Sequence, residues 1–344
     1  MSNAAIVLVT NPGDSAISTY RLTGETLEPL AVTGGLPGTG TFAVDEHRDL
    51  VFAGVKGEPS GIWTLALDRA SGALTPLSRI DVEASMAYLT LAAEGRLLLG
   101  ASYGGHCGAV WPVDEKGRLG DPVARISYPN AHSVLATDRH AYFVSLGADL
   151  VAQYDLGTDG TLTSLDPPTV AAPAGSGPRH IVISPDGTNV YVCTEFSGEA
   201  LRFARDRESG VLTFTEAVPA HDTTRGLGHS VIGANPLEHH YIWGADLHLT
   251  PDGRRLLCSE RTESTLVTIE VGPDGQLLGP TSISDTERQP RGFTLSPDGN
   301  HVIATGEKST NVALSRIEED GTLTLASRTP TGAGANWVRA IPLG

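Results

Sequence analysis

Short apolar runs recur along the chain and alternate with stretches rich in polar and turn-forming residues. Each run holds about four aliphatic, β-branched or aromatic residues and is bounded by Gly, Pro, Asp or Asn, a pattern that predicts buried β-strands. Helical periodicity is not sustained anywhere. Seven such runs occur, at residues 6–9, 50–53, 96–99, 141–144, 189–192, 255–258 and 301–304. The pattern therefore predicts a repeat protein built from strands.

Two kinds of turn accompany the apolar runs. In the first kind, a glycine precedes a strand that contains leucine, and the intervals between these glycines range from 43 to 65 residues. Seven copies are present, at Gly24, Gly72, Gly117, Gly160, Gly210, Gly275 and Gly321. In the second kind, Ser/Thr-Pro-Asp-Gly precedes three of the apolar runs, at residues 184–187, 250–253 and 296–299. Proline presets φ and glycine supplies positive φ, so these segments predict tight turns whose aspartates have a structural role.

The repeat length is that of a four-stranded propeller blade, and seven copies predict an all-β fold, a seven-bladed β-propeller with four-stranded blades. We expect residues 1–344 to form this single propeller, with a long insertion at about residues 219–244 between two blades. Because neighbouring strands run in opposite directions, the two kinds of turn lie on one face of the disc. The starts of the innermost strands and the ends of the second strands lie on the other face, at the channel mouth.

Five polar residues lie where this partition places the channel mouth. His132, Arg179 and Arg291 open innermost strands, whereas Glu195 and Arg261 close second strands. Each one taken alone is typical of an ordinary strand end. Together, the arginines could bind a carboxylate or phosphate while the histidine and the glutamate form an acid–base pair beside it.

Composition and charge exclude several classes of function. The formal net charge of −16, with no cluster of Lys and Arg to offset it, disfavours binding to nucleic acid and to anionic membranes. No apolar run reaches membrane-spanning length, and the first residues lack the pattern of a signal peptide, so we expect a cytoplasmic protein. A closed propeller has no free sheet edge, and we expect a monomer.

Metal and nucleophile motifs are also lacking. The histidines at 106, 239 and 240 have no accompanying carboxylate-rich or HExxH pattern, and we expect no metal ligation. Cys107, Cys193 and Cys258 show no CxxC spacing, which predicts reduced thiols that pack in the interior. No GxSxG elbow or glycine-rich phosphate loop is present, which argues against α/β-hydrolases and nucleotide enzymes.

Several segments resemble the propeller lactonase family. They span nearly the whole chain and include residues 175–187, 191–195, 245–253, 289–293 and 336–338. The resemblance is closest to the bacterial propeller-type 6-phosphogluconolactonases and extends to the fungal carboxymuconate-lactonizing enzyme. It implies that His132, Arg179, Arg261 and Glu195 are the catalytic residues and that neither a metal nor an organic cofactor takes part.

The resemblance implies hydrolysis of a small anionic sugar lactone, 6-phosphogluconolactone or a related aldono- or aldarolactone. Either Glu195 or His132 would activate water, and the sequence leaves this choice open. We expect a second set of residues to contact the substrate, namely Tyr103, His180, Asp246, His248 and Arg291. The insertion at 219–244 would reshape the pocket. Two alternatives stay open: a cycloisomerase of a muconate-type diacid and a non-catalytic propeller scaffold.

Overall fold

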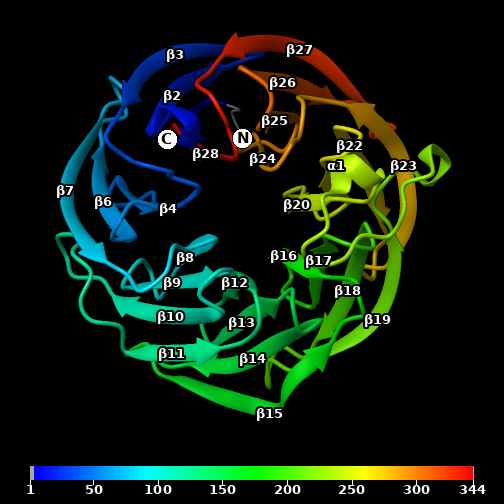
Figure 1. Ribbon diagram of the computed structural model, residues 1–344, viewed down its shortest axis with the longest axis horizontal. Coiled ribbons are helices and arrows are strands. Elements are labelled where there is room, and N and C mark those ends of the chain that lie inside the picture. The colour runs from blue at the N-terminus through cyan, green and yellow to red at the C-terminus, as the bar shows by residue number, and fades with distance from the viewer. Residues whose placement is uncertain (1–3, 344) are drawn as a thin grey trace.

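Seven four-stranded sheets surround a central channel in the computed structural model, which describes residues 4–343 (Figure 1). Every paired strand within a sheet runs antiparallel to its neighbour. The predicted seven-bladed all-β propeller is therefore confirmed. We number the blades 1 to 7 in chain order of their second strands, counted from the channel outward.

The 28 described strands fall into four rings. The innermost strands are β28 (Trp337–Pro342), β4 (Thr41–Asp45), β8 (Tyr88–Ala92), β12 (Ala131–Ala136), β16 (Pro178–Ile183), β20 (Gly244–Leu249) and β24 (Phe293–Leu295). The second strands are β1 (Ala5–Asn11), β5 (Leu50–Val55), β9 (Leu97–Ser102), β13 (His140–Ser145), β17 (Asn189–Thr194), β21 (Arg255–Glu260) and β25 (His301–Thr305). The third strands are β2 (Ala16–Thr23), β6 (Gly61–Leu67), β10 (Cys107–Pro112), β14 (Leu150–Leu156), β18 (Glu199–Arg205), β22 (Thr265–Val271) and β26 (Asn311–Ile317). The outermost strands are β3 (Thr26–Thr33), β7 (Leu74–Asp81), β11 (Ala124–Ser127), β15 (Leu162–Ala171), β19 (Leu212–Pro219), β23 (Leu277–Asp285) and β27 (Leu323–Pro330).

The apolar runs of the sequence form the second strands, and this position explains their composition. Each second strand packs against the neighbouring blade on both sides of its sheet, so β1, β5, β9, β13 and β17 are buried at every residue. A strand that is buried on both faces selects apolar residues continuously rather than alternately. The outermost strands face solvent and expose most of their residues, as in β3 and β19.

The ring closes by joining the two ends of the chain in one blade. Strand β28 pairs antiparallel with β1, from Ala5 opposite Pro342 to Thr10 opposite Trp337. The Trp337 indole Nε1 donates a hydrogen bond to the Phe42 carbonyl of β4 at 3.1 Å, which ties blade 1 to blade 2. Closure of this kind gives blade 1 its innermost strand, so this blade has four strands like the other six.

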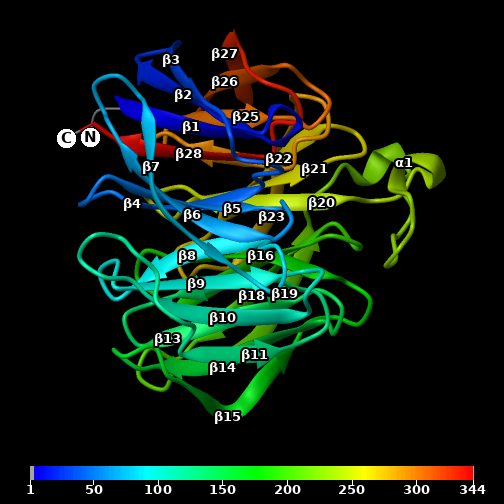
Figure 2. The same ribbon diagram turned by 60° about the vertical axis from the view of Figure 1, so that its left-hand side comes forward.

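Few residues lie in helices, and most of these belong to one insertion. A 3₁₀ turn, η1 (Pro12–Asp14), follows β1. The connection from β19 to β20 contains the 3₁₀ turn η2 (Thr223–Arg225) and the single-turn helix α1 (Pro236–His239). Figure 2 shows α1 projecting from the face of the disc opposite to the chain termini. Among residues 4–343, no helix combines the length and the apolar character that crossing a bilayer requires.

Two glycines of blade 5 give a matched test of the turn chemistry. Gly187 and Gly210 have nearly equal positive φ values of 73° and 74°. A Cβ atom at Gly187 would approach no other atom closer than 3.6 Å, whereas a Cβ at Gly210 would overlap the His140 ring. Gly187→Ala should therefore lower the free energy of unfolding by only about 1 kcal/mol, the cost of a left-handed backbone conformation for alanine. Gly210→Ala should cost about 1–3 kcal/mol more because the buried ring must move.

Urea denaturation of the two variants measures this difference in the free energy of unfolding. Equal losses in the two variants would contradict the close packing of the His140 ring against this turn.

Candidate active site

Six of the nine candidate residues line one cavity of the structure. This cavity has a volume of about 410 Å³ and lies at the channel mouth on the face that carries α1. Its lining includes the candidates Tyr103, His132, Arg179, Glu195, Arg261 and Arg291. The remaining lining residues are Gly40, Lys56, Ser85, Met86, Ala87, Gly104, Trp243 and Asn336. The three other candidates, His180, Asp246 and His248, do not line it.

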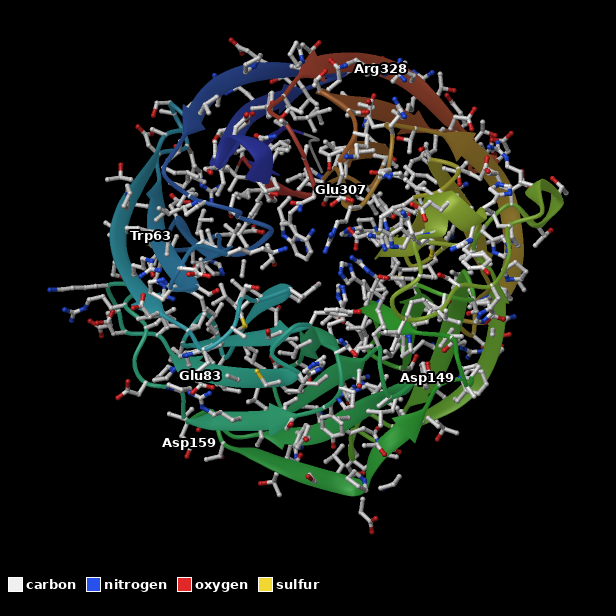
Figure 3. All side chains as sticks on the ribbon, in the orientation of Figure 1. Trp63, Glu83, Asp149, Asp159, Glu307 and Arg328 are labelled. Atoms are coloured by element: carbon white, nitrogen blue, oxygen red, sulfur yellow. The ribbon has the colours of Figure 1, made fainter. Side chains whose placement is uncertain are left out.

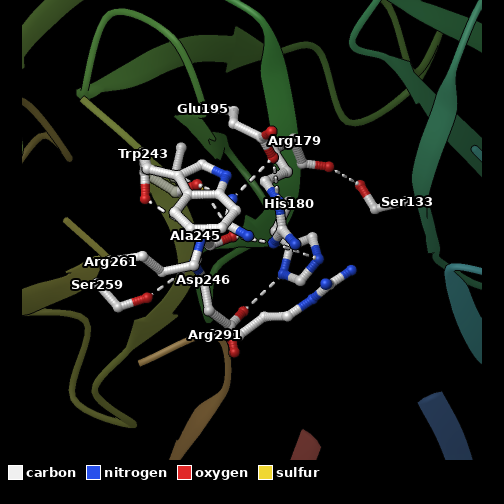
Figure 4. A network of polar contacts seen from close by, with 12 residues as sticks. Ser133, Arg179, His180, Glu195, Trp243, Ala245, Asp246, Ser259, Arg261 and Arg291 are labelled. Atoms are coloured by element: carbon white, nitrogen blue, oxygen red, sulfur yellow. Dashed lines mark hydrogen bonds and ion pairs between the residues drawn. The ribbon is translucent and has the colours of Figure 1, made fainter. Parts of the chain in front are cut away.

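A partly buried carboxylate holds two arginines together at the centre of the site (Figure 4). Glu195 follows β17, and its Oε2 atom lies 2.8 Å from Arg179 Nε and 3.0 Å from Arg261 Nη2. The side chains of Arg179 and Arg261 are only 1% and 2% exposed. Burial would raise the pKa of Glu195, but Arg261, Arg179 and Arg291 outweigh it and lower that pKa. Glu195 is thus an ionised anchor for two guanidinium groups.

Backbone carbonyls of β20 fix the same two arginines. Arg179 Nη1 donates to the Ala245 carbonyl, and Arg261 Nη2 donates to the Gly244 carbonyl at 3.1 Å. Burial lowers the pKa of Arg261 to about 9 against the opposing effect of Glu195, so this group keeps its charge at neutral pH. Fixed donors of this kind need little rearrangement when negative charge develops on a substrate.

A second row of polar residues supports Arg179 from behind. Arg179 Nη1 donates to His180 Nε2 at 3.0 Å, which leaves the proton of the neutral ring on Nδ1. That Nδ1–H donates to Asp246 Oδ1 at 2.7 Å, and Asp246 Oδ2 lies 3.4 Å from His248 Nε2. Burial would raise the pKa of Asp246, but His248 and His180 hold it well below its usual range. His180, Asp246 and His248 therefore orient Arg179 instead of lining the cavity.

His132 is the buried imidazole of the cavity, and it is 4% exposed. Its Nδ1 atom has no hydrogen-bond partner among the described residues. Burial, followed by the charge of Arg179, lowers the pKa of His132 well below its usual value. The Tyr103 ring packs edge-on against it, with 5.9 Å between the centroids. His132 is thus neutral at neutral pH and able to accept a proton.

Strand irregularities aim these side chains. The innermost strands of blades 4, 5 and 6 pair irregularly with their second strands near the site. The register shifts lie between Ala131 and Ser133, between Pro178 and Ile181, and between Gly244 and Leu247. A bulge breaks the alternation of side chains and turns residues away from their expected side. In blade 5 it leaves Arg179 at the cavity while the adjacent His180 reaches Asp246.

The insertion after β19 delivers Trp243 to the cavity. Its indole stacks on Arg261, with 3.9 Å between the guanidinium carbon and the ring centroid. The backbone N–H of Trp243 donates to Glu260 Oε1 at 2.9 Å, and the Arg261 N–H donates back to the Trp243 carbonyl at 3.0 Å. The indole therefore helps to hold the Arg261 guanidinium in place beside the cavity.

Two charged residues at the site, Lys56 and Glu307, were not among the residues predicted from the sequence. Lys56 follows β5 as Glu195 follows β17 and Arg261 follows β21, so its place in the repeat could have found it. Glu307 forms an ion pair with Arg291 at 3.2 Å. Figure 3 shows Glu307 at the inner edge of the ring, in contrast to Arg328 and Asp159 at the rim.

Other predicted features can be placed as well. The turn aspartates Asp186, Asp252 and Asp298 each accept a hydrogen bond from a backbone N–H two residues later, as expected of turn formers. All three cysteines are free, and Cys193 and Cys258 are buried. Within the described range, no three His, Cys, Asp or Glu residues are grouped to hold a metal ion.

The family model of lactonases with a seven-bladed β-propeller matches residues 4–340. The chain belongs to this family. The family resemblance inferred from the sequence motifs is thus confirmed.

Individual relatives of the lactonase family match along the whole chain. The 6-phosphogluconolactonase of Serratia proteamaculans is 29% identical over 345 residues, which cover 98% of each chain. That of Yersinia enterocolitica is 28% identical over 348 residues, again 98% of each chain. The structure of the periplasmic gluconolactonase of Pseudomonas aeruginosa superposes with a TM-score of 0.86 at 25% identity, covering 99% of this chain and 100% of that one. A Lactobacillus plantarum protein, at 22% identity, shares the fold with a TM-score of 0.86, covering 98% and 100%.

The buried polar row makes stability depend on pH. Burial and Arg179, against the effect of Asp246, lower the pKa of His180 to about 3, whereas the pKa of an unfolded histidine is about 6.5. Between these values the unfolded chain binds a proton that the native state excludes. The free energy of unfolding should therefore fall as the pH decreases from about 6.5 toward 3, by up to about 1.4 kcal/mol per pH unit for this group.

Urea denaturation at several pH values should show a shallower slope for His180→Asn than for the unmodified chain. The exposed His47→Asn is the matched control and should keep the full slope. Identical slopes for all three proteins would contradict a neutral, buried His180.

Proposed function

We propose that this protein hydrolyses a sugar lactone, 6-phosphogluconolactone or a related aldono- or aldarolactone, to the open-chain acid. The observation that carries the proposal is the neutral, unpartnered His132 in the same cavity as two guanidinium groups fixed by Glu195. Membership of the lactonase family supports it, as do the names of the relatives.

His132 acts as the general base in this proposal. It takes a proton from water, whose oxygen attacks the lactone carbonyl, and the oxyanion that forms is stabilised by Arg179 and Arg261. When the ester C–O bond breaks, protonated His132 returns the proton to the leaving alkoxide. Burial and the arginines disfavour the charged imidazolium, which opposes the first transfer and favours the second.

Glu195 has a different role from the base. Two arginines share its Oε2 atom as ion-pair partners, so this oxygen is committed to holding them. Its Oε1 atom accepts no hydrogen bond from residues 4–343 and is free to accept one from a substrate hydroxyl. Glu195 therefore positions the arginines and orients the substrate.

The distribution of aromatic residues disfavours a scaffold role. A protein-binding face is expected to expose aromatic anchors. Trp111 and Trp337 are buried, and Trp63 and Trp243 are only partly exposed. The polar side chains instead converge on one concave site.

Direct assay with lactones tests the proposed function. The purified protein should accelerate the opening of 6-phosphogluconolactone or of an aldono- or aldarolactone over the spontaneous rate, as followed by acid release. Failure on all of these lactones, together with formation of a lactone from a muconate, would instead identify a cycloisomerase.

Substitution of the two candidate bases distinguishes their roles. His132→Asn should lower kcat about 10²- to 10⁴-fold, the usual contribution of general base catalysis. Glu195→Gln, which keeps the shape of the anchor, should lower kcat only about 10-fold. Because the pKa of His132 lies well below 6.5, kcat/KM should be constant above pH 6.5 and fall at lower pH.

The pH profile of kcat/KM should keep its acid limb in Glu195→Gln and lose it in His132→Asn. An acid limb that disappears in Glu195→Gln and persists in His132→Asn would assign the base to Glu195.

A further inference from the structure

A second set of polar groups lines the same cavity on the side away from His132. Lys56 follows β5 of blade 2, and Asn336 precedes β28 of blade 1. His132 lies in blade 4, and Arg179 and Glu195 belong to blade 5. In a ring of seven blades, blade 1 stands opposite blades 4 and 5 (Figure 1). The two sets of residues therefore face each other across the channel mouth.

Lys56 contributes a cation that the protein does not neutralise directly. Within the described part of the chain, it forms no ion pair with a carboxylate, whereas Arg291 pairs with Glu307 at 3.2 Å. Loss of solvation, followed by the charge of Arg291, lowers the pKa of Lys56, against the opposing effect of Glu307. Because Lys56 has lost solvation and lies near the positive charge of Arg291, an anion that enters the cavity would stabilise its charged form.

Asn336 is held so that its amide N–H₂ is available to a ligand. The Thr10 hydroxyl donates to Asn336 Oδ1 at 2.7 Å, which assigns the oxygen to the side of β1. The Nδ2 atom is then directed toward Gly40, where a Cβ atom would lie 3.8 Å from it.

Gly40 leaves room for a ligand beside these donors. Apart from Asn336, only the Gly38 carbonyl would come within 4 Å of a Cβ atom at this position, at 3.9 Å. The missing side chain thus opens a space that adjoins Lys56 and Asn336 in the same cavity.

We propose that Lys56 and Asn336 form a distal anion subsite that binds the phosphate or carboxylate group remote from the lactone carbonyl. The inference rests on the proposed function, because the carbonyl must lie at His132 for the far end of the substrate to reach blades 1 and 2. A lysine ammonium binds such groups as a point charge, and the amide adds a directed hydrogen bond. Lys56 is then the residue that selects lactones with a charged group remote from the ring carbonyl.

Three lactones of equal ring size that differ only at C6 test the subsite. They carry a phosphate ester (6-phosphoglucono-1,5-lactone), a carboxylate (glucaro-1,5-lactone) or a neutral hydroxymethyl group (glucono-1,5-lactone). Lys56→Met should lower kcat/KM for one or both charged lactones about 10- to 100-fold, the usual effect of losing a hydrogen bond to a charged group. The value for glucono-1,5-lactone should change less than about twofold. The charged lactone that is affected identifies the anion.

Two further variants separate charge from shape. Lys116→Met removes the same charge from an exposed turn on the opposite face and should leave all three values unchanged. Gly40→Val fills the space beside Asn336 without changing charge, and it should lower kcat/KM for the charged lactones more than for glucono-1,5-lactone.

The possible failures have different meanings. If Lys56→Met lowers all three values equally, or lowers none, the subsite is overturned while the proposed hydrolysis stands. If the unmodified protein opens none of the three lactones, the proposed function itself is overturned.

Discussion

The pairing of β28 with β1 is the constraint on which the rest of the structure depends. Seven sheets enclose a channel only if the last innermost strand returns to the first blade, and here the C-terminal strand completes the sheet begun at the N-terminus. The same strand carries Trp337, which binds β4 through its indole, and it follows Asn336, which lines the cavity. Closure of the ring therefore also places Asn336 at the site.

A closed ring of antiparallel sheets gives the site its chemistry. Each blade presents the start of its first strand and the end of its second strand at the same mouth, so seven blades offer two positions each. Blades 4 to 6 place a histidine, two arginines and a glutamate at these positions. Buried guanidinium groups need partners for their donors, and the carbonyls of Gly244 and Ala245 supply them beside Glu195. The positive charge of the mouth is thus held inside a protein whose net charge is −16.

Much of this arrangement could be predicted from the sequence because it follows from repetition and strand direction. The seven apolar runs predict the second strands, and alternation of direction predicts that Arg179 and Glu195 meet on one face. The separate roles of Arg179 and His180 could not be predicted in this way. They depend on the irregular pairing between Pro178 and Ile181, which interrupts the alternation of side chains. Lys56 was overlooked because a single lysine at a strand end resembles ordinary surface until the ring places it in the same cavity as His132.

The proposed hydrolysis depends on His132 as a neutral base in direct reach of the sugar substrate. NMR of the protein labelled with ¹⁵N-histidine, with the His132 signals assigned from the spectrum of His132→Asn, tests it most directly. We expect a neutral ring at pH 6.5 and above, and shifts of its signals when the stable product 6-phosphogluconate or a related sugar acid is added. A ring that is protonated at pH 6.5, or one that is unaffected by every sugar acid, would contradict the role of His132 as the base.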